Sequence, residues 1–130
     1  MDISEKETLI IKCERRFYLV DLQTIDYVEA AGNNVRVHCG ADSFFVKEGL
    51  SSFFGRLPKP QFVRVSRSIL LNTRSIFELR FKRPFNFEIR LHNGSTHTCT
   101  RSYRRAFCDA IGLVLDNRNV GKPRAVWKKD

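Results

Sequence analysis

Residues 62–72 read Phe-Val-Arg-Val-Ser-Arg-Ser-Ile-Leu-Leu-Asn and place a short polar segment between two apolar runs. Phe62–Val65 is typical of an extended strand, and Ile69–Leu71 supplies a second anchor, so both ends can be fixed in a core. An arginine held in this way has a fixed backbone, and its guanidinium is free to form hydrogen bonds with a base edge or a phosphate. A strand with a solvated arginine explains the stretch equally well. The stretch thus requires apolar packing on both sides and leaves the role of Arg67 open.

Most of the remaining chain consists of short segments rich in β-branched and aromatic residues, separated by turn residues. Val35–Cys39 alternates strictly between apolar and other side chains, the pattern of a half-buried strand. Asn93-Gly94 is the strongest short hairpin signal. The predicted strands are Thr8–Cys13, Phe17–Asp21, Ile25–Ala30, Val35–Cys39, Ser43–Val46, Ser75–Phe81, Phe87–Leu91 and Thr96–Thr100.

Two segments have helical periodicity instead. In Glu48–Leu57 the apolar residues recur at helical spacing, and Pro58-Lys59-Pro60 ends the pattern. A final helix is expected after Thr100 or Ser102, either of which can cap it. Its apolar positions are Tyr103, Phe107, Ala110, Ile111, Val114 and Leu115. The fold class predicted is mostly β, with two or more small antiparallel sheets, one short central helix and one C-terminal helix.

The length of 130 residues suits one domain with a real core. We expect an N-terminal arm over 1–7, a domain over 8–115 and a basic tail over 116–130. Trp127 is an exception to the polar and basic character of this tail. No apolar run is long enough to span a bilayer, and the polar start does not resemble a secretory signal. These features predict a cytoplasmic chain without membrane contact.

Catalysis and metal binding have little support in the sequence. His38, His92 and His97 neighbour no nucleophile or paired carboxylate in a recognisable spacing, and no glycine-rich phosphate loop is present. The four cysteines are scattered without zinc-ligand or Cys-x-x-Cys spacing, which indicates reduced, buried thiols. We expect no enzyme activity, no metal site and no cofactor.

The charge is strongly asymmetric along the chain. Residues 1–60 carry 8 Lys and Arg against 9 Asp and Glu, whereas residues 61–130 carry 15 against 5. A basic half of this kind favours a polyanionic partner, with nucleic acid first and an anionic membrane surface second. The membrane interpretation needs a basic helix with a broad apolar face, but the apolar side of the last helix is required by the core.

Three turn-like positions carry hydrogen-bonding groups beside rigid elements. Asn and Arg match base edges in the major groove, and Ser, backbone N–H groups and helix starts suit phosphates. Each position alone is weak evidence, but together with the charge asymmetry they predict a binding face. The candidate residues are Asn33, Asn34, Arg64, Ser66, Arg67, Ser68, Arg101, Ser102 and Arg104.

The order of these motifs resembles the LytTR-type DNA-binding domain family. The resemblance rests on Ile25–Asn33, on Leu50–Leu57, on Phe62-x-Arg-Val-x-Arg-Ser-x-Leu-x-Asn72, on Leu91-x-Asn-Gly94 and on Thr100–Tyr103. It covers roughly Ile10 to Leu115. It implies an elongated arrangement of small β-sheets in a bacterial transcription regulator, whose loops enter successive major grooves, usually over paired direct repeats.

The resemblance also assigns roles to single positions. Asn33 matches the turn from which the family reaches bases, Arg67 matches the arginine of its Arg-Val-His-Arg-Ser run, and Arg101-Ser102 match the pair before the terminal tyrosine. Two positions depart from the pattern: Ser66 replaces the usual histidine, and Asn34 stands where an aromatic residue is expected. Base preference therefore cannot be transferred from the family.

The leading hypothesis is sequence-specific binding of double-stranded DNA for transcriptional regulation. An upstream input domain or partner protein and dimerisation on DNA remain open. The alternative is a protein-interaction module whose basic face binds an acidic partner. An RNA-binding sheet is less favoured, because Phe87–Leu91 keeps its apolar residues on the face that the core needs.

Overall fold

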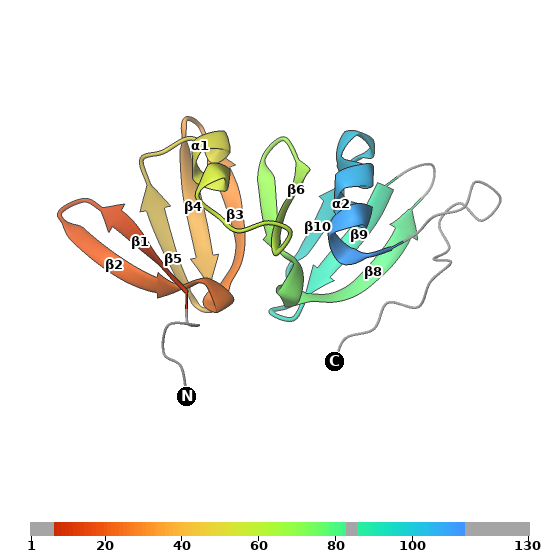
Figure 1. The fold of residues 1–130 in the computed structure, drawn as a ribbon, viewed down its shortest axis with the longest axis horizontal. Coiled ribbons are helices and arrows are strands. Elements are labelled where there is room, and N and C mark those ends of the chain that lie inside the picture. The colour runs from red at the N-terminus through yellow and green to blue at the C-terminus, as the bar shows by residue number, and fades with distance from the viewer. Residues whose placement is uncertain (1–6, 83–85, 114–130) are drawn as a thin grey trace.

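The computed structural model describes residues 7–82 and 86–113. Its elements form an elongated row, shown in Figure 1. In chain order they are β1 (Thr8–Cys13), β2 (Arg16–Asp21), η2 (Leu22–Thr24), β3 (Ile25–Ala31), β4 (Asn34–Cys39), β5 (Asp42–Val46), α1 (Leu50–Gly55), β6 (Phe62–Ser66), β7 (Ile69–Asn72), η3 (Thr73–Ser75), β8 (Ile76–Lys82), β9 (Asn86–Leu91), β10 (Thr96–Cys99), η4 (Arg101–Tyr103) and α2 (Arg104–Ile111), where η marks a 3₁₀-helix.

The strands form three small antiparallel sheets. β1 and β2 pair with each other, a central five-stranded sheet has the order β5-β4-β3-β7-β6, and a third sheet has the order β10-β9-β8. The pairing of β3 with β7 joins segments that are far apart in the sequence, with Val28 opposite Leu70. The mostly-β fold class and the small antiparallel sheets predicted from the sequence are therefore confirmed.

Two hydrophobic cores lie side by side along the long axis. The first lies between the five-stranded sheet, the β1–β2 hairpin and α1, and includes the fully buried Ile11, Val28 and Phe53. The second lies between the β8–β10 sheet and α2, and includes Ile89 and Phe107. The β6–β7 hairpin contributes side chains to both cores, because successive residues of a strand point to opposite faces of the sheet. It gives Phe62 and Leu70 to the first core and Val63, Val65 and Leu71 to the second.

The two predicted helices are present with shifted ends. α1 buries Leu50 and Phe53 as the periodicity predicted, and Leu57 is buried just beyond its end. α2 ends at Ile111, earlier than its apolar pattern predicted, because Gly112 adopts a left-handed conformation with φ +75°. The predicted cap was wrong in its chemistry: Thr100 precedes η4, but its side chain makes no capping hydrogen bond, and Tyr103 precedes α2.

Several sequence predictions fall outside the described residues. They concern residues 1–6 of the arm, Val114 and Leu115 of the helical pattern, and the tail with Trp127. Within the part of the chain that the structure describes, no helix combines the length and apolarity that crossing a bilayer requires.

Candidate nucleic-acid interface

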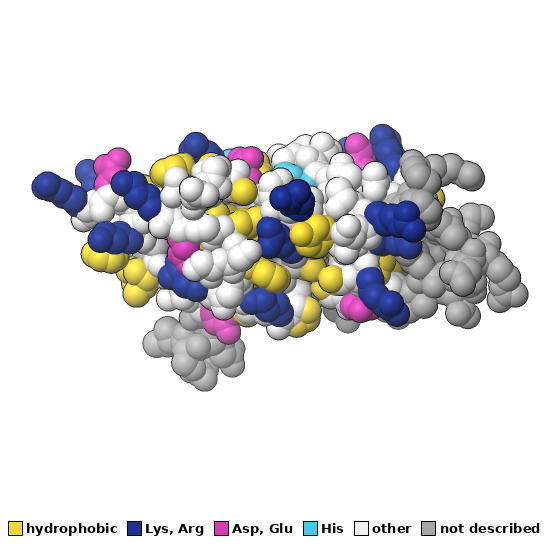
Figure 2. All heavy atoms as spheres, turned by 90° about the horizontal axis from the view of Figure 1, so that it is seen from above, with side chains coloured by type: hydrophobic (Ala, Val, Ile, Leu, Met, Phe, Trp, Pro, Cys, Tyr) yellow, Lys and Arg dark blue, Asp and Glu magenta, His cyan; other side chains and the backbone are white. Residues whose placement is uncertain are grey.

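The three predicted polar positions lie at one edge of the molecule, uppermost in Figure 1. This edge carries the β3–β4 turn, the β6–β7 turn and the η4 segment at the start of α2. We call it the turn edge. Figure 2 looks onto the same edge and shows Lys and Arg side chains distributed along its length, with fewer acidic side chains between them.

The β3–β4 turn consists of Gly32 and Asn33, since Ala31 pairs with Asn34 across the hairpin. Gly32 has φ +65°, a conformation that glycine adopts without steric cost, and nothing lies within 4 Å of its missing Cβ. Asn33 is exposed at the tip, and Asn34 begins β4 half-buried. The amide of Asn33 is therefore presented to solvent by a turn whose shape is set locally.

The β6–β7 turn consists of Arg67 and Ser68, since Ser66 pairs with Ile69. Both turn residues are exposed, and neither has positive φ. The hydroxyl of Ser66 accepts a hydrogen bond from the Ser68 N–H at 3.2 Å. Among the described residues the Arg67 side chain makes no hydrogen bond, ion pair or ring contact, so its guanidinium has no such partner that folding needs.

The third position is the η4 segment, with Arg101 and Ser102 exposed and Arg104 half-buried at the first position of α2. The N–H of Thr100 donates to the carbonyl of Val65 at 3.0 Å, which fixes the segment to β6. The helix start therefore lies beside the Arg67 turn. Free N–H groups at a helix N-terminus favour an anion, so this position suits a phosphate.

Backbone contacts also connect the two hairpin turns. Ala30, at the end of β3, donates from its N–H to the carbonyl of Ser68 at 2.8 Å. The start of α1 reaches the other turn, because a Cβ on Gly49 would lie 3.9 Å from the carbonyl oxygen of Asn33. The three predicted positions are thus held by one connected scaffold.

Arg64 has contacts that distinguish it from the other predicted arginines. It lies half-buried in β6, and three of its N–H groups are engaged within the protein. Nε donates to the carbonyl of Ser66 at 3.2 Å, Nη2 to the carbonyl of Arg67 at 2.6 Å, and Nη1 to the hydroxyl of Ser51 at 3.1 Å. We predicted Arg64 as a DNA-contacting residue, but its guanidinium is turned onto the Arg67 turn.

Asn72 occupies the base of the β6–β7 hairpin and is fully buried. Its Nδ2 donates to the carbonyl of Ile25 at 2.8 Å, and its Oδ1 accepts from the Arg74 N–H at 3.0 Å. A buried side-chain amide whose donor and acceptor are both hydrogen-bonded within the protein has a structural role. Asn72 thus bonds the backbone of its own turn and also joins that turn to β3.

Two of the three histidines, His38 and His97, pack on Tyr27 between two sheets. The ring of Tyr27 stacks on His38 at 4.2 Å and packs at the same distance against His97, while His38 Nε2 lies 2.7 Å from a carboxylate oxygen of Glu29. Burial lowers the pKa of His97 below its ordinary value, and the positive charge of a protonated His38 acts in the same direction, while Glu29 opposes them. The hydroxyl of Ser95 lies 3.0 Å from His97 Nε2 and donates to Asn93 Oδ1 at 2.7 Å, so it takes part in the hydrogen bonds of the β9–β10 turn.

Cys39, Cys99 and Cys108 are buried in environments that suppress thiolate formation, whereas Cys13 is half-buried. Burial raises the pKa of Cys39 to about 11 and that of Cys99 to about 12, and it raises the pKa of Cys108 as well. Such thiols are poor nucleophiles and poor metal ligands near neutral pH. Among the residues that the structure describes, no cluster of three His, Cys, Asp or Glu could hold a metal ion.

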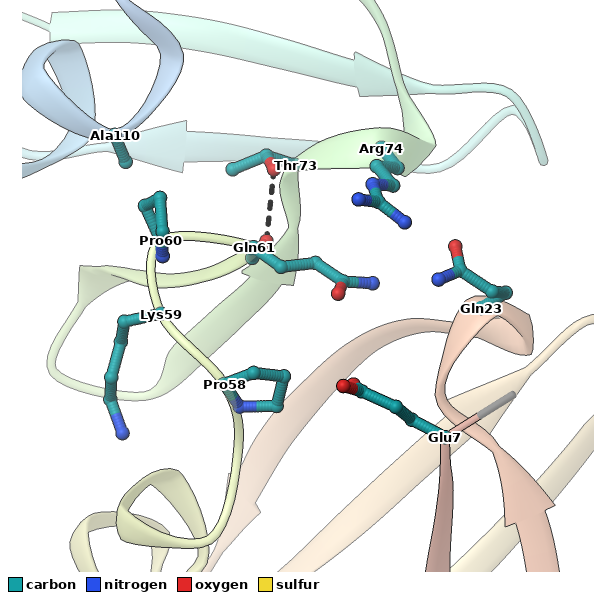
Figure 3. Close-up of a pocket in the computed structure, with 9 residues that line it drawn as sticks. All are labelled: Glu7, Gln23, Pro58, Lys59, Pro60, Gln61, Thr73, Arg74 and Ala110. Atoms are coloured by element: carbon teal, nitrogen blue, oxygen red, sulfur yellow. Dashed lines mark hydrogen bonds between the residues drawn. The ribbon is translucent and has the colours of Figure 1, made fainter. Parts of the chain in front are cut away.

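One pocket of about 430 Å³ lies away from the turn edge, between η2, the segment before β6 and η3 (Figure 3). Gln23, Gln61 and Arg74 extend into it opposite Glu7, and the Thr73 hydroxyl donates to the carbonyl of Gln61 at 2.9 Å. Its lining includes one carboxylate and no histidine or cysteine. This composition does not offer paired acid–base groups.

Sequence reasoning missed two residues that support the turn edge. Ser51 accepts from Arg64, and the Tyr103 ring lies 5.9 Å from the Arg64 guanidinium. The sequence places Tyr103 on the apolar side of the last helix and in the family motif, and Ser51 carries no local signal of a contact with Arg64. Their role follows from contacts across the fold.

Comparison with known proteins identifies the fold and the family. The family model of the LytTr DNA-binding domain matches residues 15–112. The chain is 28% identical over 109 residues to the sensory transduction protein LytT of Enterococcus faecalis, covering 84% of this chain and 45% of LytT. It is 23% identical over 114 residues to the transcriptional regulatory protein LytR of Staphylococcus aureus, covering 88% and 46% of the two chains. The chain thus spans about half the length of the curated relatives it matches.

A solved structure of a LytTr DNA-binding domain from Bacillus cereus has the same fold. The TM-score is 0.74 at 24% sequence identity, and the match covers 83% of this chain and 99% of that one. The elongated row of small antiparallel sheets is therefore the fold of the domain that the sequence motifs resembled. Since the family model matches most of its length, the chain belongs to the LytTr DNA-binding domain family.

Proposed function

We propose that this chain binds double-stranded DNA in a sequence-specific way and that its turns enter successive major grooves. Its family is one of DNA-binding domains, which supports DNA binding for transcriptional regulation and a role other than catalysis. Relatives named as a transcriptional regulatory protein and as a sensory transduction protein support regulation by an input signal. Direct-repeat sites, dimerisation on DNA and an input domain are parts of the proposal.

The observation that carries the proposal is the coincidence of three polar tips on one edge. Asn33, Arg67 and the Arg101-Ser102 pair come from different elements and are all exposed. Asn can pair with an adenine edge and Arg with a guanine edge, and the η4 segment suits a phosphate. The contacts from Ser68 to Ala30 and from Val65 to Thr100 hold these tips in register.

Selection of genomic fragments with the purified protein, followed by footprinting, tests the proposal. We expect an enriched site with protection that recurs at about one helical turn, roughly 10 base pairs, because successive major grooves on one side of the duplex have that spacing. A single short protected patch without bending would contradict insertion into successive grooves. Failure to enrich any duplex would contradict specific DNA binding itself.

The salt dependence of binding separates DNA from an acidic protein partner. If phosphates supply much of the affinity, the logarithm of the binding constant should fall with the logarithm of salt concentration by about 0.9 per neutralised phosphate. The basic residues 61–130 motivate this expectation. A nearly flat dependence would support the acidic-partner alternative.

A further inference from the structure

The Arg67 turn lacks the backbone chemistry that usually stabilises a two-residue hairpin turn. Favoured hairpin turns place one or both central residues at positive φ, which is why Gly and Asn are common there. Neither Arg67 nor Ser68 has positive φ, and the pairing register shifts between Arg64 and Ser66 just before the turn. The conformation of this tip therefore depends on contacts from outside it.

Arg64 supplies two of these contacts, and the others are the bond from the Ala30 N–H to the Ser68 carbonyl and the bond from the Ser68 N–H to the Ser66 hydroxyl. The Nε and Nη2 groups of Arg64 donate to the carbonyls of Ser66 and Arg67, the residue just before the turn and the first residue within it. Two N–H groups from one planar guanidinium fix two successive carbonyls in a single geometry, since the directions of its donors are rigid. The direction in which the Arg67 side chain leaves the backbone is set by these carbonyls.

The same guanidinium connects the turn to both neighbouring elements. Nη1 donates to Ser51 in α1 at 3.1 Å, and α1 starts beside the Asn33 turn. The Tyr103 ring in η4 lies 5.9 Å from the guanidinium carbon, at the limit of a cation–π contact. Arg64 thus contacts the element behind each of the other two candidate positions.

We propose that Arg64 is a positioning residue that determines the base preference of the turn edge by fixing the Arg67 turn, and that it does not itself neutralise a phosphate. This inference rests on the proposed function. The sequence analysis predicts Arg64 as a DNA-binding residue, and this inference gives it a supporting role instead. Lysine cannot replace it, because one ammonium does not reproduce the planar fork.

The test compares Arg64→Gln, Arg64→Lys and Arg67→Ala on the selected operator, on operators with single base changes and on an unrelated duplex. We expect Arg64→Gln to reduce the ratio of operator to unrelated-duplex affinity by at least about fivefold, the lower end of the worth of a bidentate base contact. The base preference of Arg64→Gln should be weakened at the same base pairs of the operator as that of Arg67→Ala. Arg64→Lys should also relax it, while the salt slope stays at the wild-type value in both variants.

The double variant Arg64→Gln with Arg67→Ala is the decisive control. If Arg64 acts through Arg67, adding Arg64→Gln to Arg67→Ala should cause no further loss of discrimination. A phosphate contact would instead weaken all duplexes uniformly and lower the salt slope by about 0.9, which would overturn the inference. Thermal melts identify a merely structural role: an early-melting Arg64→Gln that keeps the wild-type base preference would also overturn it.

Wild-type behaviour on the same duplexes separates this inference from the proposed function. If the wild-type chain prefers no operator over the unrelated duplex, the proposal of specific DNA binding is wrong. If it prefers one and Arg64→Gln keeps the same profile, only the role of Arg64 fails.

Discussion

The β3–β4 and β6–β7 hairpins belong to the same sheet and reach the same edge, yet their turns are stabilised differently. The first turns through Gly32, whose φ of +65° needs no outside support. The second turns through Arg67 and Ser68, which lack positive φ and are held by the Arg64 guanidinium and the Ser66 hydroxyl. One tip is specified by local backbone chemistry and the other by tertiary contacts.

This difference suggests a division of labour between the two tips. A glycine turn keeps its shape whatever its neighbours are, so Asn33 can be presented independently of the rest of the edge. A turn held by side chains places a large charged group where glycine or asparagine would otherwise be required. The cost is that its geometry depends on Arg64 and, at the base of the hairpin, on Asn72.

The largest effect is expected from removing the amide at the base of the second hairpin. Asn72→Ala would leave the carbonyl of Ile25 and the N–H of Arg74 without their partners, each at a cost of about 1–3 kcal/mol. We expect a loss of about 2–4 kcal/mol in the free energy of unfolding, measured by urea denaturation. Asn33→Ala makes the same change at the exposed tip of the first hairpin and should stay within about 0.5 kcal/mol of wild type. Equal losses would refute the assigned roles.

The next effect is on binding and concerns the tip of the second hairpin. Arg67→Ala should weaken operator binding by about 1–3 kcal/mol, the usual worth of a bidentate base contact. Its melting temperature should remain near the wild-type value, because the exposed side chain makes no hydrogen bond or ion pair with the described residues. Titrations and thermal melts of the same preparation measure both. An early-melting variant with intact DNA affinity would reverse the assignment.

A smaller effect on stability is expected from the glycine turn. Gly32→Ala places a Cβ at φ +65°, which costs roughly 1–2 kcal/mol for an L-residue even though no atom lies within 4 Å of the new carbon. Gly55→Ala in α1 is the matched control, since its Cβ also meets nothing within 4 Å and its φ is not positive. The control should be neutral or slightly stabilising. If both variants lose the same stability in denaturant titrations, the turn is not specified as described.

The smallest effect tests how the first hairpin packs against the β8–β10 sheet, through Tyr27 of β3 and His97 of β10. Burial lowers the pKa of His97 in the folded state, so the unfolded chain binds a proton there more readily. Stability from the packing of His97 on Tyr27 should therefore be complete above the ordinary histidine pKa of about 6.5 and decline as pH falls below it. Melts between pH 7.5 and 5 should show this decline.

Two histidine variants identify the residue responsible for that decline. His97→Gln should flatten it, whereas the same change at the exposed His92 should leave it unchanged. The groups facing His97 are Tyr27, Ser95, Glu29 and His38. A decline that persists in His97→Gln would show that the burial of His97 is not its cause.

Local patterns predicted the elements well and the assembly less well. Val35–Cys39 and Phe87–Leu91 form strands as their alternation predicted, since period-two burial is a local property. The pairing of β3 with β7 and the bond from Asn72 to Ile25 bring distant residues together, and no local pattern specifies such partners. The helix end at Gly112 was also missed, because the apolar spacing continued past a residue that took a left-handed conformation.

The same contrast between local patterns and contacts across the fold applies to the candidate site. Exposed tips such as Asn33 and Arg67 could be predicted, because turn residues and flanking strands are neighbours in sequence. Arg64 could not be separated from them, because its partner Ser51 belongs to a different element and Tyr103 to a third. An arginine that supports a turn and an arginine that extends from it look alike in a sequence.

The placement of the β6–β7 hairpin between two cores has a consequence for how the domain opens. Phe62 and Leu70 pack into one core while Val65 and Leu71 pack into the other, so the hairpin forms a wall of both. If either core opened, the β6–β7 hairpin would lose its packing on one face, and the other core would lose the support of that hairpin. The two cores should therefore lose their structure together in a single cooperative transition, and the amides of β7 should exchange with solvent only through that global opening.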